Sequence, residues 1–329
     1  MSHSLVTAKI TQDIEDKLKQ FLHLPAKDIS GRQKKSLRQM LISYGYQAGL
    51  MDRQEKPENL KKINLLNDLI EDLHEASLVI DDIEDESNFR RGEPSLHVKY
   101  GLPTALNTAN WIYFRSLEKI MFASEFDDLL KNKILSWTLL VMRQAHEGQA
   151  LDLNNLMKVD LPQIPDENFY KYITELKTGA LTGLAAGLAS MLSNSDDERF
   201  LKYFKIGQTI GVFIQQLNDI GNIEKRISNQ NFFEDARNKK ISWVNYLAPV
   251  VLPPSTWSDL EKLILNSVNP NDLSIFCRQN NVYEVLRNHV FKKLDEFAAV
   301  SSQVCECANP DLTEAQFKKI VQTLKQHYE

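Results

Sequence analysis

Apolar residues recur at intervals of three and four through most of this chain, which is the spacing that buries one face of a helix. The clearest stripes predict helices over residues 7–23, 60–85, 127–153, 166–176 and 206–224. A basic stretch at residues 31–38 opens another predicted helix that ends near Ala48. No segment alternates apolar and polar residues for long enough to build a sheet, so the pattern predicts an all-α protein.

Capping residues and breakers suggest where several helices begin and end. Pro25 is expected to end the first helix, because proline lacks the amide hydrogen that a helix interior needs. Thr104 is expected to cap a helix that runs through Ser116, and Asp196 to open another with an acidic cap. From about residue 256 onward the pattern predicts several amphipathic helices.

The most apolar stretch, Gly179–Leu192, is rich in glycine and alanine. It is too short to cross a bilayer as a helix. We therefore expect a buried helix that packs tightly against its neighbours.

Composition narrows the class of protein further. The 329 residues are 43% hydrophobic and include only 12 Gly and 11 Pro, which favours long helices around a sizeable core. The net charge of -5 gives no reason to expect a nucleic-acid partner. Three sparse cysteines without ligand-like spacing, and a start without the features of a signal peptide, indicate a cytoplasmic protein rather than a secreted or integral membrane one.

One predicted helix ends in three aspartates, and two arginines follow it. Asp81 and Asp85 lie one helical turn apart and so face the same way. Two such carboxylates suit Mg²⁺, which keeps several waters and completes its coordination with phosphate oxygens. Arg90 and Arg91 add positive charge in the planar geometry that matches phosphate. A solvated acidic helix end is the alternative, but the apolar residues that lead directly into Asp81 argue against it.

Other polar groups interrupt otherwise apolar helices. The polar residues at 146–152 form either a hydrogen-bonded seam between helices or the wall of a pocket. Lys177 either complements a helix dipole or serves a site. The polar helix end at residues 215–222 resembles the first acidic motif in spacing but carries less charge. The basic stretch at residues 31–38 is either a solvated face or an anion site.

Along the chain, a basic stretch is followed by an acidic helix end, two arginines, Lys177 and a second polar helix end. This order of motifs resembles that of the trans-isoprenyl diphosphate synthases, and most of all the geranylgeranyl diphosphate synthases of eukaryotic type. The resemblance runs from about residue 25 to the end of the sequence. Its most specific parts are residues 74–101 and 106–114, with support from residues 148–152 and 309–312.

The resemblance implies one all-α isoprenoid synthase domain over residues 1–329, with ten or more helices around a deep cavity. It also implies a homodimer, with a heteromer containing another prenyl synthase as the alternative. The implied reaction is Mg²⁺-assisted loss of pyrophosphate from an allylic diphosphate, attack by isopentenyl diphosphate on the carbocation, and loss of a proton. This chemistry needs preset charges that neutralise the leaving group and a cavity that excludes water.

The same resemblance assigns the site residues motif by motif. Metal ligands are expected at both acidic helix ends, at Asp81, Asp85, Asn218, Asp219 and Asn222. The residues expected to hold the allylic diphosphate or border its reacting carbon are Arg90, Lys177, Thr178, Gln215 and Lys240, with Asp82 as hydrogen-bonding support. The residues expected to hold isopentenyl diphosphate are Arg32, Lys35, His74 and Arg91.

Four positions depart from the family pattern. The basic motif is expected as Gly-Lys-x-x-Arg, whereas Arg32 and Lys35 stand in exchanged places, and the two residue types are not equivalent at a phosphate. Asn218 replaces an aspartate that is expected to bind the third Mg²⁺, so its amide oxygen brings no charge. Asn231 stands where a phosphate-binding lysine is expected. These changes predict a weaker second metal site and impaired activity.

Residue size along two helices bears on product length. Ala76 and Ser77 are small where farnesyl-length synthases of this family place aromatic residues, so the channel is expected to be open there. Tyr113, Phe114 and His146 are the bulky candidates for a floor two or more helical turns deeper. Because an isoprene unit roughly matches the ~5.4 Å of one helical turn, this floor predicts a C20 product.

Two other functions stay open at this point. A terpene cyclase of the same fold would share Asn218 and Asp219, but Arg226 stands where its motif needs glutamate, and it would not use an isopentenyl diphosphate site. A non-catalytic partner subunit would explain the altered second motif but not the intact first one. The leading interpretation is a prenyltransferase of the geranylgeranyl diphosphate synthase type.

Overall fold

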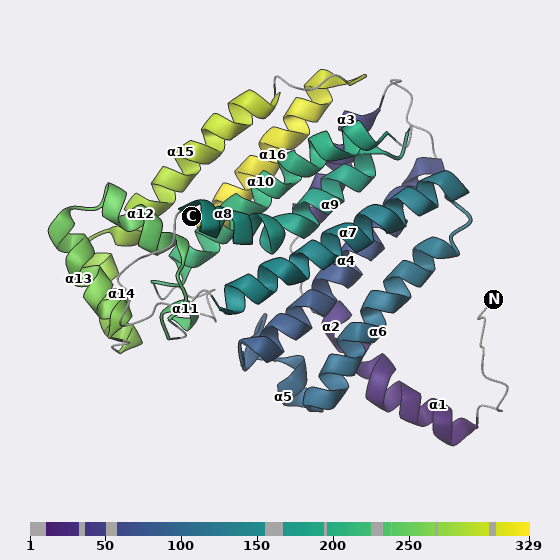
Figure 1. The fold of residues 1–329 in the computed structure, drawn as a ribbon, viewed down its shortest axis with the longest axis horizontal. Helices are drawn as coiled ribbons and strands as arrows, with labels where there is room; N and C mark the ends of the chain where they lie inside the picture. The colour runs from purple at the N-terminus through teal and green to yellow at the C-terminus, as the bar shows by residue number, and fades with distance from the viewer. Residues whose placement is uncertain are drawn as a thin grey trace. The chain divides into compact units, whose positions relative to one another are not determined.

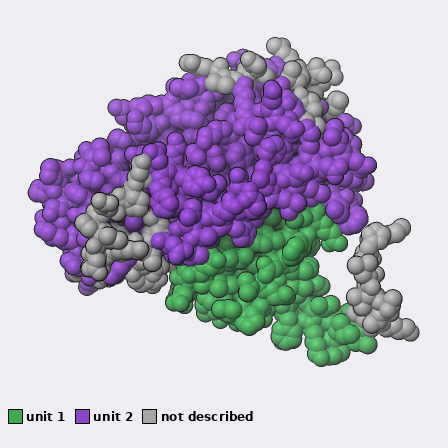
Figure 2. All heavy atoms as spheres, in the orientation of Figure 1, with its two compact units in different colours: residues 1–34, 71–118 green, residues 35–70, 119–329 purple. Residues whose placement is uncertain are grey.

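The computed structural model describes residues 11–32, 37–50, 58–154, 167–193, 196–224, 233–237, 239–266, 269–302 and 307–329. Lys35, Arg226 and Asn231 lie outside these residues. The described chain is helical apart from two short strands and the connecting turns, which confirms the all-α prediction. It divides into two compact units, residues 1–34 with 71–118 and residues 35–70 with 119–329 (Figure 2). The single domain over residues 1–329 stays a prediction.

The first unit contains short helices around a small apolar core. Its elements are α1 (Gln12–Leu18), the π-helix η1 (Lys19–His23), α2 (Leu24–Gly31), the second half of α4 (Glu58–Glu84), α5 (Leu96–Tyr100) and most of α6 (Leu102–Met121). Strands β1 (Phe89–Arg90) and β2 (Glu93–Pro94) pair antiparallel between α4 and α5. The core gathers Ala26, Ile29, Ala76, Val79, Leu96, Ala105, Ala109 and Ile112.

Pro25 does not end the first helix, and this expectation was wrong. The π-helix η1 leads directly into α2, and Pro25 lies in the first turn of α2. Proline is tolerated there because the amides of a first turn have no partner within their own helix.

The second unit contains the remaining helices. They are α3 (Leu37–Gly49), the first half of α4, α7 (Asp128–Leu153), α8 (Glu167–Leu176), α9 (Thr178–Ser190), α10 (Asp197–Gly221), α11 (Glu234–Arg237), α12 (Trp243–Val251), α13 (Pro254–Leu265), α14 (Pro270–Gln279), α15 (Val282–Ser302) and α16 (Pro310–Tyr328). Helix α9 packs against both α10 and α3 (Figure 1).

The glycine- and alanine-rich helix is buried, as predicted. Every residue of α9 from Gly179 to Ser190 is buried. Its neighbours approach it through their own glycines: a Cβ at Gly45 of α3 would lie 2.1 Å from the Ala186 carbonyl oxygen, and one at Gly207 of α10 would lie 2.4 Å from that of Thr182. The three helix backbones therefore lie closer together than larger side chains allow.

Several predicted helix boundaries needed correction. Helix α6 begins at Leu102, two residues before the expected cap Thr104, because Pro103 is accommodated in its first turn. Asp196 does cap α10, accepting the Glu198 amide at 3.0 Å, but the same helix continues through most of the segment predicted as a separate helix over 206–224. Helix α12 was not predicted from the sequence.

None of the helices in the described part of the chain is both long and apolar enough to cross a membrane.

Replacing Gly207 with alanine tests the close approach of α10 to α9. The new Cβ would meet the backbone of Thr182, which cannot yield as the end of a flexible side chain can. We expect Gly207→Ala to lower the free energy of unfolding by roughly 1–3 kcal/mol, the usual cost of overpacking, in chemical denaturation. Gly31→Ala is the control, because a Cβ there meets no atom within 4 Å. Equal losses in the two variants would contradict this explanation.

Candidate functional site

The first acidic motif occupies the last turn of α4. The Asp85 amide donates to the Asp81 carbonyl at 2.9 Å, so helical geometry continues to Asp85 and sets the two carboxylates on one side. Both residues are half-buried, whereas Asp82 is buried. Asp81 and Asp85 are therefore more exposed than Asp82, and they share the helix face that their spacing predicts.

Asp82 pairs with Arg90, which lies in β1. The Arg90 Nε donates to Asp82 Oδ1 at 2.7 Å, its Nη2 contacts the same oxygen, and Nη2 also reaches Asp81 Oδ2 at 3.4 Å. Burial raises the pKa of Asp82 to about 6, and the Arg90 charge and hydrogen bonds offset part of that rise. Asp82 thus orients Arg90, which agrees with a supporting role.

Arg91 and Gly92 form the turn between the two strands. Both have positive φ, 55° and 87°, which is the conformation of a tight hairpin turn and costs energy for a residue with a Cβ. Arg32 reaches this hairpin: its Nη1 donates to the Arg90 carbonyl at 3.3 Å and its Nη2 to the Pro94 carbonyl at 2.9 Å. Three of the predicted diphosphate-binding arginines therefore lie together in the first unit. His74 is half-buried on α4.

In the second unit, the two predicted lysines meet at one carboxylate. Lys177, at the start of α9, lies 2.7 Å from Asp152 Oδ2, and Lys240 lies 3.6 Å from the same oxygen. Asp152 belongs to the polar stretch on α7, but its role was not predicted. The negative charge of Asp152 offsets the repulsion between the two lysine ammonium groups, and both lysines are half-buried.

Thr178 and Gln215 also come together, as expected for residues of one site. The Thr178 hydroxyl donates to Gln215 Oε1 at 2.6 Å, and Gln215 Nε2 donates to Asp219 Oδ1 at 2.7 Å. A Cβ at Gly211 would lie 2.6 Å from the Gly179 Cα, so these two glycines let α9 and α10 approach closely enough for the contact.

Asp219 is buried and surrounded by donors. Besides Gln215, two groups donate to Asp219 Oδ2: the Tyr170 hydroxyl at 2.7 Å and the Trp243 amide at 2.8 Å. Burial raises the pKa of Asp219 to about 6, although these three donors stabilise its anion. Tyr170 and Trp243 carried no signal in the sequence, because they lie on other helices far from the motif.

The two asparagines of the second motif differ in their contacts. Asn218 Oδ1 accepts a hydrogen bond from the Tyr328 hydroxyl at 2.5 Å, which the sequence did not predict. The Tyr328 carbonyl in turn accepts from the Tyr283 hydroxyl at 2.7 Å. Asn222 Oδ1 is buried and has no hydrogen-bond partner among the residues described.

The donor chemistry of these motifs can be compared with the needs of Mg²⁺. In the first motif, Asp81 and Asp85 supply two carboxylates on one side of a helix, which fits. In the second, the Asn218 amide oxygen and both Asp219 oxygens already accept hydrogen bonds from the protein. Asn222 Oδ1 is buried and accepts none among the residues described. Within the described ranges, no three His, Cys, Asp or Glu side chains are arranged to hold a metal ion. Metal binding at the second motif stays a prediction.

The residues predicted to set product length lie in different environments. Ala76 is fully buried in the core of the first unit, and Tyr113 packs against that core. Burial raises the pKa of Tyr113. Phe114 is 73% exposed and His146 is exposed as well, so neither packs as a floor residue within its own unit. Ser77 is half-buried and donates to the His74 carbonyl at 2.7 Å.

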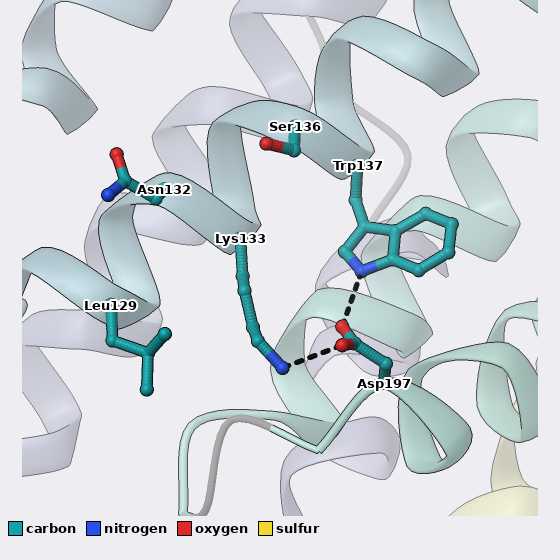
Figure 3. A pocket seen from close by; sticks show the side chains of 6 residues that line it. All are labelled: Leu129, Asn132, Lys133, Ser136, Trp137 and Asp197. Atoms are coloured by element: carbon teal, nitrogen blue, oxygen red, sulfur yellow. Dashed lines mark hydrogen bonds and ion pairs between the residues drawn. The ribbon is translucent and has the colours of Figure 1, made fainter.

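An open surface pocket lies apart from the predicted residues. It is lined by α7 residues and by the first residue of α10, Asp197. Figure 3 shows Lys133 and Trp137 pointing toward Asp197, to which they donate at 2.7 and 3.0 Å. These hydrogen bonds lower the pKa of Asp197 and satisfy its carboxylate. These residues therefore join α7 to α10, and the pocket is not part of the candidate site.

Comparison with known proteins gives a consistent result. The polyprenyl synthetase family matches residues 19–269. A terpene synthase of Matsumurasca onukii is 32% identical over 184 residues, covering 55% of this chain and 56% of that protein. A geranylgeranyl pyrophosphate synthase of Eremothecium gossypii is 33% identical over 193 residues, covering 56% and 57%. The matches thus span less than two thirds of these relatives' own length.

Solved structures share the fold. A geranylgeranyl pyrophosphate synthase aligns with a TM-score of 0.74 at 16% identity, over 92% of this chain and 91% of its own. A polyprenyl synthase from Caulobacter crescentus CB15, complexed with calcium and isoprenyl diphosphate, aligns with a TM-score of 0.71 at 17% identity, over 96% and 90%. These alignments confirm the isoprenoid synthase fold.

Tyr170→Phe tests the donors around Asp219. The substitution removes the hydroxyl that donates to a buried carboxylate and leaves the ring in place. We expect the free energy of unfolding to fall by roughly 1–3 kcal/mol, because a buried acceptor loses its partner. Tyr172→Phe is the control on the same helix, since Tyr172 is 54% exposed. A loss no greater than that of the control would show that the hydroxyl contributes nothing to stability.

Proposed function

This chain belongs to the polyprenyl synthetase family, and we propose that it condenses isopentenyl diphosphate with an allylic diphosphate to give geranylgeranyl diphosphate and pyrophosphate. The observation that carries the proposal is the meeting of Lys177 and Lys240 at Asp152, beside the Thr178 to Gln215 hydrogen bond. Two half-buried cations at one point are better suited to bind a diphosphate, which carries several negative charges, than a ligand with only one.

The reaction breaks the bond between the allylic carbon and its diphosphate oxygen. The double bond of isopentenyl diphosphate then attacks the allylic cation, and the adduct loses a proton to form the new double bond. Asp81 and Asp85 would hold Mg²⁺, which would supply positive charge to stabilise the departing pyrophosphate. The side chains proposed to bind a diphosphate are Arg90 in the first unit and Lys177 with Lys240 in the second.

The remaining side chains position the substrates. Thr178 and Gln215 present oxygen atoms to the electron-poor allylic carbon, and their mutual hydrogen bond keeps them oriented. Arg91 and His74 hold isopentenyl diphosphate. Tyr113 is the residue with the best support as a chain-length floor, because it packs against the core that contains Ala76. By sequence spacing, a floor two or more helical turns beyond Ala76 and Ser77 suits a C20 product.

We extend the proposal to a cytoplasmic homodimer. Helix α6 presents Leu102, Leu106 and Phe114 to solvent at 52, 40 and 73% exposure, which is an apolar surface that a second copy of the chain can cover. A heteromer with another prenyl synthase would use the same surface. The free thiols of Cys277 and Cys307 suit a reducing compartment.

One assay tests this function against its alternatives. Purified protein is incubated with Mg²⁺, isopentenyl diphosphate and each of the C5, C10, C15 and C20 allylic diphosphates, and products are analysed before and after phosphatase. From the C5, C10 and C15 substrates we expect C20 prenyl alcohol only after phosphatase and only with isopentenyl diphosphate, and we expect no elongation of the C20 substrate. Hydrocarbons or cyclic alcohols formed without isopentenyl diphosphate would refute the proposal in favour of a cyclase. Activity that appears only with an added synthase would indicate a partner subunit.

Asn218→Asp tests the altered second motif. The new carboxylate keeps an oxygen for the Tyr328 hydroxyl and adds the charge that the amide lacks. We expect elongation to become faster. We also expect the Mg²⁺ concentration at half-saturation to fall by roughly tenfold, which corresponds to about 1.4 kcal/mol of binding free energy. Asn271→Asp adds the same charge at an exposed position of α14, outside the motif, and serves as the control. An active wild type that gains nothing from Asn218→Asp would show that the amide already suffices.

A further inference from the structure

Arg32 differs from the other predicted diphosphate-binding cations in its burial. Only 4% of its side chain is exposed, against 17% for Arg90 and 25% for Lys177. Arg32 follows directly after α2 in extended backbone and directs its guanidinium into the first unit. A diphosphate cannot readily reach a group that is covered in this way.

The guanidinium is also largely occupied by protein acceptors. Its Nε donates to Asp28 Oδ1 at 3.3 Å, one helical turn earlier. Its Nη1 and Nη2 donate to the carbonyls of Arg90 and Pro94. All three nitrogens are therefore engaged, and two of them hold the backbone on both sides of the Arg91 turn.

The hairpin needs such support. Its strands are two residues long, and a hairpin of that size is not stable on its own. Arg91 has a φ of 55°, a conformation that a residue with a Cβ adopts only when its surroundings hold it there. The Ser95 amide closes the base by donating to the Asn88 carbonyl at 2.9 Å, and Arg32 contacts the hairpin backbone from outside it.

Resting on the proposed function, we propose that Arg32 is a positioning residue that fixes the hairpin carrying Arg90 and Arg91 and does not itself bind isopentenyl diphosphate. Since Arg90 serves the allylic diphosphate and Arg91 serves isopentenyl diphosphate, Arg32 acts on both substrates at once. This role differs from the one that the basic motif predicts.

The residue type supports this role. The planar guanidinium directs donors to three separate acceptors at once, whereas a lysine ammonium is a compact charge on a flexible stem. Arginine where the family pattern has lysine is therefore suited to joining Asp28 to two carbonyls. The arginine at residue 32 therefore serves as a structural link between α2 and the hairpin, and not as a weakened ligand for diphosphate.

Asp28 anchors the other end of this link. Its second oxygen accepts from Lys99 at 2.7 Å and from the Tyr100 hydroxyl at 3.0 Å. Burial alone would raise the pKa of Asp28, but these hydrogen bonds and the charges of Arg32 and Lys99 lower it, so the carboxylate is ionised at neutral pH. Arg32 is thus held in place by a charge that no substrate supplies.

The test combines amide exchange with kinetics of the full chain. In substrate-free Arg32→Lys, we expect the amides of residues 89–93 and 95 to exchange roughly tenfold faster than in the wild type. Opening the wild-type hairpin breaks its hydrogen bonds to the Arg32 guanidinium, and the variant lacks that cost. We also expect KM to rise roughly tenfold for both diphosphates. Asp28→Asn, which weakens the anchor without touching the hairpin, should move both quantities in the same direction.

The control is Lys99→Gln, which removes one positive charge from the same carboxylate but leaves all three Arg32 contacts. It should change neither exchange at residues 89–95 nor either KM. Unchanged exchange in Arg32→Lys, or a KM increase confined to isopentenyl diphosphate, would overturn the proposal. A wild type without condensation activity would refute the proposed function alone, because the exchange comparison needs no substrate.

Discussion

Cations can be held close together in a folded protein only when carboxylates offset their mutual repulsion. Three aspartates do this for the predicted diphosphate-binding residues. Asp152 receives both Lys177 and Lys240, Asp82 receives Arg90, and Asp28 receives Arg32. Each aspartate keeps its cations ordered before any substrate arrives, which lowers the entropy cost of binding a diphosphate.

The two lysines and two of the arginines use these pairs differently. Lys177 and Lys240 share one carboxylate oxygen of Asp152. Arg90 retains a contact with Asp81, which lies on the metal-binding side of the first motif. Arg32 is fully committed to protein acceptors. Lys177 and Lys240 are thus brought to one point, where the allylic diphosphate is proposed to bind.

Close packing of helices supports the second group of site residues. Gly179 and Gly211 bring α9 and α10 near enough for Thr178 to bond Gln215, which in turn bonds Asp219. Tyr170 completes the chain from α8. A buried carboxylate is costly unless donors surround it, so these helices and the carboxylate depend on one another.

Local pattern determined a large part of this protein. Apolar periodicity set the helices, and the spacing of Asp81 and Asp85 set their common face, because both depend on residues a few positions apart. The order of motifs indicated the family. Tertiary structure alone decided which distant residues meet: Tyr328 at Asn218, Tyr170 and Trp243 at Asp219, and Arg32 at the hairpin. Single residues of this kind leave no periodic trace, since their partners come from other helices. The role of a charged side chain in this chain therefore depends less on its motif than on the acceptors that folding brings to it.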